Sequence, residues 1–303
     1  MMRFGLIGLG RFGKHYLRLL TSLPEVELLA IANHSSGVFS EYKEKIPPQC
    51  ITTIDTNTLL QNPAIDCIVI ATPATTHFDL IQKALLAGKH VLVEKPMVTT
   101  AEEAKKIETL AKKQGKTLMV GYQYIYHDAI RYLKTSFDFG NVNYFFGEHL
   151  SSGPVRTDVG CFMDAGVHDL AIIEYLFAPG RIAGVKGASA GTSDDFTAVS
   201  VTFESGLFAH LVTSWIAPEK VRKVTIVGEN GSAVLDDRKE KDKLQIFHKE
   251  SMVTPTIDLH EPLRNELEHF IHCVQTSESP LTGAAFGCRV TEMCDTIVRN
   301  MNS

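Results

Sequence analysis

The chain has 303 residues, which suits two domains of ordinary size better than one. Hydrophobic residues make up 44% and charged residues 21% of the sequence, as in folded globular proteins and unlike disordered ones. The formal net charge of -5 and the scattered Lys and Arg residues exclude a broad basic surface for nucleic acid or an anionic membrane. We therefore expect small-molecule partners.

The N-terminal residues run directly into an apolar β-strand, without the longer apolar region and cleavage site of a signal peptide. No stretch approaches the roughly 20 apolar residues that a membrane span needs. The cysteines are scattered, with no CxxC or other metal-type spacing. We expect a cytoplasmic protein with reduced thiols, no metal site and no membrane partner.

In the first part of the chain, short β-branched runs alternate with longer helical patterns, as in a parallel sheet built from βαβ units. Strands are expected at residues 3–7, 27–32, 67–71, 90–94 and 117–121, and helices at 13–20, 77–87 and 100–114. The last of these helices follows a Thr cap and begins with two acidic residues. The sequence predicts an α/β domain over residues 1–121, a doubly wound Rossmann sheet.

The pattern changes after Gly121. We expect a helix near 129–135, a strand near 142–149, a polar Gly-rich loop, a helix over 161–177 and two closing helices at 264–276 and 286–300. Residues 183–248 alternate as strands, with turn signals at Glu204-Ser205-Gly206 and Glu229-Asn230-Gly231. These features predict a second, α+β domain over residues 122–303, with a large, mostly antiparallel open sheet.

A glycine-rich motif, Gly8-Leu9-Gly10-Arg11-Phe12-Gly13, follows the first expected strand and opens the first expected helix. In the pattern GxGxxG the glycines permit a tight turn and close approach of the backbone to a pyrophosphate, and the helix N-terminus offers free N–H groups to that anion. The alternative is a Gly-rich turn with a structural role only. Because of its position we predict a dinucleotide-binding loop.

The segment about 20 residues beyond this motif bears on the choice of cofactor, because an acidic residue there binds the ribose 2′-hydroxyl of NAD. This chain has Asn33, His34, Ser35 and Ser36 instead. A neutral Asn can bind a diol without repelling a 2′-phosphate, and the His and Ser side chains could donate to one. The segment leaves NAD and NADP open and slightly favours NADP.

Two more segments end at the carboxyl edge of the expected parallel sheet, where ligands of such sheets bind. Ala71-Thr72-Pro73 is either a cofactor-facing edge or a simple turn, and Glu94-Lys95-Pro96 closes another strand. A lysine beside bound nicotinamide can hydrogen-bond the reacting hydroxyl and stabilise a developing alkoxide, although a solvated surface lysine is the alternative. A Lys-Pro bond can also be cis.

Asp164 and His168 are four residues apart in a helical pattern, so we expect them on one face of a helix. His can take a proton near neutral pH, and a neighbouring carboxylate can orient it. Such a pair is also compatible with a structural hydrogen bond. Asp169 points about 100° away in an α-helix and is therefore left outside the predicted site.

Together these segments resemble the glucose-fructose oxidoreductase and inositol dehydrogenase family, often written Gfo/Idh/MocA. The resemblance covers nearly the whole chain through residues 8–13, 71–73 with His77, 87–96 and 164–169. It implies an NAD(P)-dependent oxidoreductase with Lys95, Asp164 and His168 as the catalytic residues, which are the three that side-chain chemistry also selects. It further implies a homodimer or homotetramer joined through the sheet of the second domain, which would also bind the substrate.

The candidate cofactor-binding residues are Gly8, Gly10, Arg11, Phe12, Gly13, Asn33, His34, Ser35, Thr72, Pro73, His77, Glu94 and Lys95. The candidate substrate-binding residues are Lys95, Tyr122, Asp164, His168 and Arg222.

Residues 214–223 and 261–267 are similar to family members that oxidise nucleotide sugars, particularly UDP-N-acetylglucosamine at the 3-hydroxyl. Lys220, Arg222 and Lys223 could pair with a diphosphate or could form the solvated face of a sheet. We expect oxidation of a secondary hydroxyl on a sugar, with a nucleotide sugar as substrate. The alternatives are a polyol or inositol dehydrogenase, a keto-sugar reductase and, from another class, a regulator that binds dinucleotide without turnover.

Overall fold

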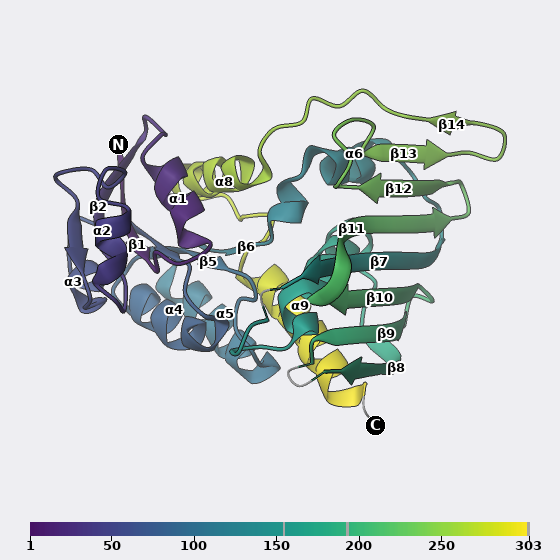
Figure 1. The fold of residues 1–303 in the computed structure, drawn as a ribbon, viewed down its shortest axis with the longest axis horizontal. Helices are drawn as coiled ribbons and strands as arrows, with labels where there is room; N and C mark the ends of the chain where they lie inside the picture. Colours follow the sequence, from purple (N-terminus) through teal and green to yellow (C-terminus); the bar gives the residue numbers. More distant parts are fainter. Residues whose placement is uncertain (154, 192–193, 302–303) are drawn as a thin grey trace. The chain divides into compact units, whose positions relative to one another are not determined.

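The computed structural model describes residues 1–153, 155–191 and 194–301. The chain forms two compact units (Figure 1), one of Met1–Gly121 with Glu266–Cys288 and one of Tyr122–Asn265 with Arg289–Ser303. None of the helices in the described part of the chain is both long enough and apolar enough to cross a membrane.

The first unit is built on a sheet of six parallel strands in the order β3-β2-β1-β4-β5-β6. The strands are β1 (Met2–Ile7), β2 (Val26–Ala32), β3 (Ile51–Thr53), β4 (Cys67–Ile70), β5 (His90–Glu94) and β6 (Leu118–Gly121). The strand order reverses between the neighbours β1 and β4: β2 and β3 follow outward from β1 on one side, and β5 and β6 follow outward from β4 on the other. This reversal is the point at which doubly wound sheets bind ligands, beyond the carboxyl ends of the strands. The predicted Rossmann fold is confirmed.

Three helices that connect strands of this sheet were expected: α1 (Gly13–Leu20), α4 (His77–Leu86) and α5 (Ala101–Gln114). α5 begins where its cap predicted, because the Thr100 side chain accepts a hydrogen bond from the Glu103 N–H. Strand β3, the short helices α2 (Gly37–Glu41) and α3 (Asn57–Leu60), and the 3-10 turn η1 (Ala74–Thr76) were not expected. β3 has only three residues at the edge of the sheet, too few to show a strand period.

The closing helices are α8 (Pro262–Thr276) and α9 (Ala284–Asn300). Residues 266–288 pack within the first unit, whereas the sequence interpretation placed all of 122–303 in the second domain. The ring of Phe270 meets that of Phe4 edge-on at 6.2 Å, and the Thr282 hydroxyl donates to the Val120 carbonyl at 2.7 Å. These contacts join residues far apart in sequence, so local periodicity carries no sign of them.

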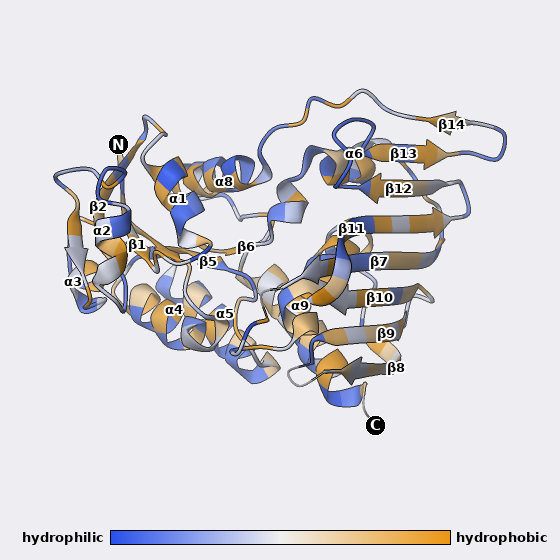
Figure 2. Ribbon diagram, viewed as in Figure 1, coloured by the Kyte–Doolittle hydropathy of each residue, from blue (hydrophilic) through white to orange (hydrophobic). Residues whose placement is uncertain are grey.

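The second unit is built on an eight-stranded sheet in the order β14-β13-β12-β11-β7-β10-β9-β8. The strands are β7 (Val142–Ser152), β8 (Ile182–Ala190), β9 (Phe196–Phe203), β10 (Phe208–Ser214), β11 (Ile216–Gly228), β12 (Ser232–Asp236), β13 (Leu244–Phe247) and β14 (Met252–Val253). All neighbours are antiparallel except β7 and β10. The predicted mostly antiparallel sheet is confirmed, and its strands carry both hydrophobic and hydrophilic segments (Figure 2).

Helix α7 (Val167–Phe177) is buried along most of its length. The sequence predicted one helix from residue 161, but residues Phe162–Gly166 form a π-helical turn, η3, ahead of α7. Asp164 therefore lies in the π-turn and His168 in the α-helix. The two residues therefore do not lie in one continuous α-helix as expected, because a π-turn closes i→i+5 hydrogen bonds; that they share a face stays a prediction. The unit also contains the 3-10 helix η2 (Gln123–Tyr126) and the helix α6 (Asp128–Ser136).

Candidate active site

The GxGxxG loop joins β1 to α1. Gly8 has φ +97°, and a Cβ there would lie 2.5 Å from the Ala71 carbonyl oxygen; a Cβ on Gly13 would overlap the carbonyl oxygen of Gly8. A Cβ on Gly10 would meet no atom within 4 Å. The outer two glycines are therefore needed for the turn itself, while Gly10 leaves open space before the N-terminus of α1. This geometry fits the pyrophosphate of a dinucleotide.

The predicted ribose segment is tied to this loop through Asn33. The Asn33 side-chain oxygen accepts from the Leu9 N–H at 3.0 Å, and its amide nitrogen donates to the Ser35 carbonyl at 3.0 Å. Asn33 is buried, whereas His34 and Ser35 are exposed. In this structure Asn33 fixes the relative position of two loops, which leaves His34, Ser35 and Ser36 as the accessible side chains of the segment.

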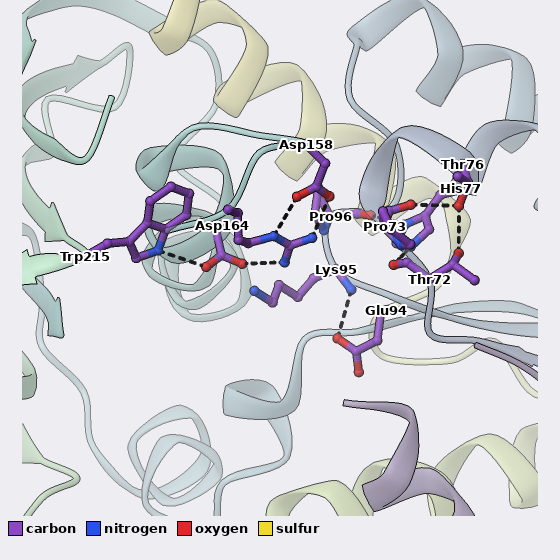
Figure 3. A network of polar contacts seen from close by, with 11 residues as sticks. Thr72, Pro73, Thr76, His77, Glu94, Lys95, Pro96, Asp158, Asp164 and Trp215 are labelled. Atoms are coloured by element: carbon purple, nitrogen blue, oxygen red, sulfur yellow. Dashed lines mark hydrogen bonds and ion pairs between the residues drawn. The ribbon is translucent and has the colours of Figure 1, made fainter. Parts of the chain in front are cut away.

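The segment after β4 forms a second loop around His77 (Figure 3). The Thr72 and Thr76 hydroxyls are 2.7 Å apart, and Thr76 donates to the Pro73 carbonyl. The buried His77 ring faces two main-chain carbonyls, with Nδ1 at 2.8 Å from Pro96 O and Nε2 at 3.0 Å from Thr72 O. His77 thus links the Thr72-Pro73 loop to the end of the Glu94-Lys95-Pro96 segment.

Lys95 follows β5 directly, and the Lys95–Pro96 bond is cis, as the sequence had suggested. The Lys95 main-chain N–H donates to Glu94 Oε2 at 3.3 Å (Figure 3). The other Glu94 oxygen accepts from the Tyr16 hydroxyl at 2.8 Å, and that hydroxyl is also 2.9 Å from Glu266 Oε1. The sequence interpretation missed Tyr16 and Glu266, which lie in two helices far from the Glu-Lys-Pro motif.

Asp164 of the second unit has both carboxylate oxygens in hydrogen bonds (Figure 3). Arg156 NH1 donates to Oδ1 at 2.9 Å, and the Trp215 indole N–H donates to Oδ2 at 3.2 Å. Arg156 also binds Asp158 through Nε and NH2, at 2.8 and 2.6 Å. Burial alone would lower the pKa of Arg156, but the two carboxylates raise it. Such partners hold Asp164 in its charged form and suit it for orienting a group.

His168 lies in a buried cluster of rings. Its imidazole is stacked on that of His149 with centroids 5.7 Å apart, and Tyr124 meets it edge-on at 5.1 Å. His149 Nδ1 is 3.0 Å from Asp169 Oδ2, and both side chains are almost completely buried. Asp169 was left outside the predicted site because it turns away from His168. Asp169 does point toward β7, but there it contacts His149, whose ring is stacked on that of His168.

Gly147 of β7 admits the Asp169 carboxylate, since a Cβ at Gly147 would lie 2.6 Å from Asp169 Oδ2. The sequence signal for this cluster is weak: His149 follows Glu148 in a strand that also has exposed residues, and Asp169 follows His168 in a mostly apolar helix. It could not be read as a pair without knowing that α7 packs on β7.

The two remaining substrate candidates are Tyr122, which is completely buried, and Arg222. Arg222 pairs with His149 across β11 and β7, so both side chains face the same side of the sheet, and Arg222 NH1 donates to the Leu150 and Val221 carbonyls. Lys223 pairs with Glu148 and faces the opposite side. Arg222 and Lys223 therefore do not form one diphosphate-binding surface.

Comparisons with known proteins agree with this architecture. Residues 2–122 match the family model described as an oxidoreductase family with an NAD-binding Rossmann fold, and residues 129–234 match the Gfo/Idh/MocA C-terminal domain. The chain is 26% identical to scyllo-inositol 2-dehydrogenase (NAD(+)) from Bacillus subtilis, covering 92% of this chain and 88% of that protein. It is also 26% identical to UDP-N-acetylglucosamine 3-dehydrogenase from Acidithiobacillus ferrooxidans, covering 95% and 94%.

A solved structure of UDP-N-acetylglucosamine 3-dehydrogenase from Acidithiobacillus ferrooxidans superposes with a TM-score of 0.89 at 24% identity, covering 99% of this chain and 97% of that one. At this identity the likeness shows the common fold. The two family models, which lie on the two predicted parts of the chain, show more: the protein belongs to the Gfo/Idh/MocA family and is an NAD(P)-dependent oxidoreductase.

Proposed function

We propose that this enzyme oxidises a secondary hydroxyl on the sugar ring of a nucleotide sugar, with UDP-N-acetylglucosamine or a close analogue as substrate. The observation that supports the catalytic roles best is that each carboxylate oxygen of Asp164 accepts a hydrogen bond, one from Arg156 and one from Trp215, which favours its ionised form. Of the Asp164 and His168 pair, only the imidazole is then suited to accept a proton.

In the proposed mechanism His168 takes the hydroxyl proton, since an imidazole titrates near neutral pH. The Lys95 ammonium stabilises the negative charge that develops on the same oxygen. Asp164, fixed by Arg156, orients the sugar or the imidazole. A bound nicotinamide would accept the hydride from the carbon that carries this hydroxyl, which leaves a ketone. The assignment of one reaction to residues of both units rests on the motifs of the family.

The glycine loop would hold the dinucleotide through the open space at Gly10 and the N–H groups that begin α1. We propose NADP as the preferred cofactor, because the accessible side chains of the ribose segment are His34, Ser35 and Ser36 and position 33 has an Asn in place of an acidic residue. A neutral segment of this kind can donate to a 2′-phosphate. Equal initial rates with NAD and NADP would overturn the preference.

A nucleotide sugar is proposed because residues 214–223 and 261–267 resemble members that act on such substrates, and because UDP-N-acetylglucosamine 3-dehydrogenase matches nearly the whole chain. Arg222 is the candidate for an anionic group of the substrate, since its side chain lies on the His149 face of the sheet. The scyllo-inositol dehydrogenase matches with the same identity, so oxidation of a free polyol is the second candidate.

The test is a panel of UDP-sugars, free sugars and inositols, each with NAD and NADP, followed by the nicotinamide absorbance. We expect reduction of the cofactor by UDP-N-acetylhexosamine and loss of activity when the nucleotide is removed from the sugar. Activity with scyllo-inositol alone would replace the nucleotide-sugar proposal by the polyol one. Lys95→Ala should abolish turnover while keeping cofactor binding; full turnover in that variant would remove Lys95 from the mechanism.

We also propose that the enzyme is a cytoplasmic homo-oligomer joined through the eight-stranded sheet. One face of this sheet leaves large apolar side chains exposed: Tyr144 and Phe208, which pair across β7 and β10, are each 41% exposed, and Phe247 is 37% exposed. A patch of this kind on a sheet is typical of a protein interface. Sedimentation of the wild type and of Phe208→Glu tests this, since the substitution should yield monomers.

A further inference from the structure

A cluster of three buried oxygen-bearing side chains lies under the Glu-Lys-Pro motif in the first unit. The Tyr16 hydroxyl is 2.8 Å from Glu94 Oε1 and 2.9 Å from Glu266 Oε1. Tyr16 and Glu266 are 0% exposed and Glu94 is 7% exposed. Three elements contribute, α1, β5 and α8, so the cluster is part of the packing of this unit.

Counting hydrogens shows that this cluster holds a proton on a carboxyl group. A phenol has one hydrogen and can donate to only one of two carboxylate oxygens. Burial and the two carboxyl groups raise the pKa of Tyr16 well above its ordinary value, so the phenol keeps that hydrogen. The second contact, at hydrogen-bond length, then needs a hydrogen from a carboxylic acid. Without it, two buried carboxylates would both face one phenol oxygen.

The acid is Glu266. Glu94 already accepts two donors, the Tyr16 hydroxyl and the Lys95 N–H, which suits a carboxylate. Glu266 Oε2 has no hydrogen-bond partner among the described residues. Burial first, and then the charge of Glu94, raise the pKa of Glu266 well above its ordinary range, with the Tyr16 hydrogen bond opposing. Tyr16 of α1 and Glu94 of β5 are thus the titratable groups that act on Glu266. The residue that β6 places beside Glu266 is Gly121.

We propose that Glu266 is held as a neutral carboxylic acid that donates to Tyr16, so that the Tyr16 hydroxyl points at Glu94 and fixes its carboxylate against the Lys95 main chain. Glu266 and Tyr16 are then positioning residues for Lys95. That part rests on the proposed function, in which Lys95 is catalytic; the protonation of Glu266 does not.

A neutral Glu266 also limits the negative charge near the GxGxxG loop. Tyr16 belongs to α1, and its ring meets that of Phe12 in the GxGxxG loop at 5.8 Å. A second carboxylate here would oppose binding of an anionic dinucleotide at the N-terminus of α1 and would break the bond that orients Tyr16. Dinucleotide affinity should therefore fall as pH rises through the folded pKa of Glu266.

The experiment compares the full-length wild type, Glu266→Gln and the control Glu268→Gln, which makes the same change at a partly exposed position of the same helix. The free energy of unfolding and the NADP and NAD dissociation constants are measured from about pH 5 to about pH 9. The folded wild type should hold about one more proton than the unfolded chain over the window between the two Glu266 pKa values, so its stability falls as pH rises. Glu266→Gln should lack this slope and the accompanying loss of affinity, and Glu268→Gln should keep both.

A slope in Glu266→Gln equal to that of the wild type would overturn the proposal, because Glu266 would then be ionised in the folded protein. Tyr16→Phe tests positioning: it should lower kcat about tenfold with little change in the sugar KM, the size expected when a hydrogen bond to a charged group is lost. An unchanged kcat would remove the positioning role. If no sugar turns over at all, the proposed function fails while the stability slopes and dissociation constants still decide the protonation.

Discussion

Two of the three candidate catalytic residues, His168 and Lys95, are each accompanied by a fully buried carboxyl group with a different kind of partner. Asp169, connected to His168, faces the imidazole of His149, whereas Glu266, connected to Lys95, faces a phenol and a second carboxyl group. A basic partner can share its proton with a buried acid and form an ion pair, but an acidic neighbour cannot. Burial alone therefore does not decide whether an acid is charged. The charge also depends on whether the neighbouring groups are basic or acidic.

The largest effect on stability should come from removing the carboxyl group of Asp169, which faces the imidazole of His149. Asp169→Ala leaves the buried His149 Nδ1 without its acceptor, and we expect a loss of about 3 kcal/mol in unfolding free energy. Asp169→Asn should lose less, because an amide oxygen can still accept from Nδ1. Glu266→Gln should change stability near neutral pH by less than about 0.5 kcal/mol, since an amide replaces a neutral acid. Chemical denaturation measures all three, and equal losses in Asp169→Asn and Glu266→Gln would erase the distinction.

The glycines that adjoin the two clusters give a second comparison. A Cβ at Gly147 would lie 2.6 Å from the Asp169 carboxylate, while a Cβ at Gly121 would lie 3.1–3.2 Å from Tyr16, Glu94 and Glu266 oxygens. Gly147→Ala should cost about 2 kcal/mol, as overpacking of a tight site does, and Gly121→Ala about half of that. Thermal unfolding of both variants tests the order, and a larger loss at Gly121 would contradict the geometry.

A third acid, Asp237, has two basic partners, His127 and Lys243. Burial alone would raise its pKa, but His127 at 3.4 Å and Lys243 at 2.7 Å lower it to about 2. A lowered folded pKa stabilises the protein above the unfolded value of about 4 and loses that contribution as pH falls toward 2. Asp237→Asn should cost about 1–2 kcal/mol near neutral pH and nothing at the acid end. A pH-independent cost in stability curves would contradict this pairing.

The smallest effects concern the two phenols. Tyr16→Phe removes the hydroxyl between two carboxyl groups and should cost about 1 kcal/mol. The Tyr124 hydroxyl is 3.5 Å from Asp237 Oδ2, so Tyr124→Phe should cost less than about 0.5 kcal/mol while its ring stays against His168. Paired denaturation curves rank the two, and the reverse order would mean that the Tyr124 hydroxyl has the stronger bond.

Most of the fold could be predicted from the sequence because it depends on local periods. Five of the six strands of the Rossmann sheet, the Thr100 cap and the alternation of residues 183–248 are each visible within a short window. The edge strand β3 is too short for such a pattern, and the π-turn before α7 is a rare local insertion that the apolar period of the helix does not reveal. The packing of residues 266–288 in the first unit depends on partners more than a hundred residues away, such as Phe4.

For the site, the motifs predicted residues whose chemistry is explicit in a short segment, such as Lys95 and the glycines at 8, 10 and 13. The groups that hold them were missed because each comes from another element: Arg156 and Trp215 for Asp164, and Tyr16 for Glu94. The contact of Asp169 with His149 was missed for a related reason. Its direction was inferred correctly from the helix, but the strand residue His149 that meets it cannot be inferred from the helix alone.

Trp215 is the only tryptophan of the chain, and its indole N–H donates a hydrogen bond to Asp164. The intrinsic fluorescence of the protein at the red edge of excitation therefore comes from a single fluorophore attached to a proposed substrate-orienting carboxylate. Any ligand that draws Asp164 away from the indole would change the polarity around that ring and shift its emission. The native enzyme thus carries its own optical reporter, with which substrate binding can be followed before any hydride is transferred and without a label.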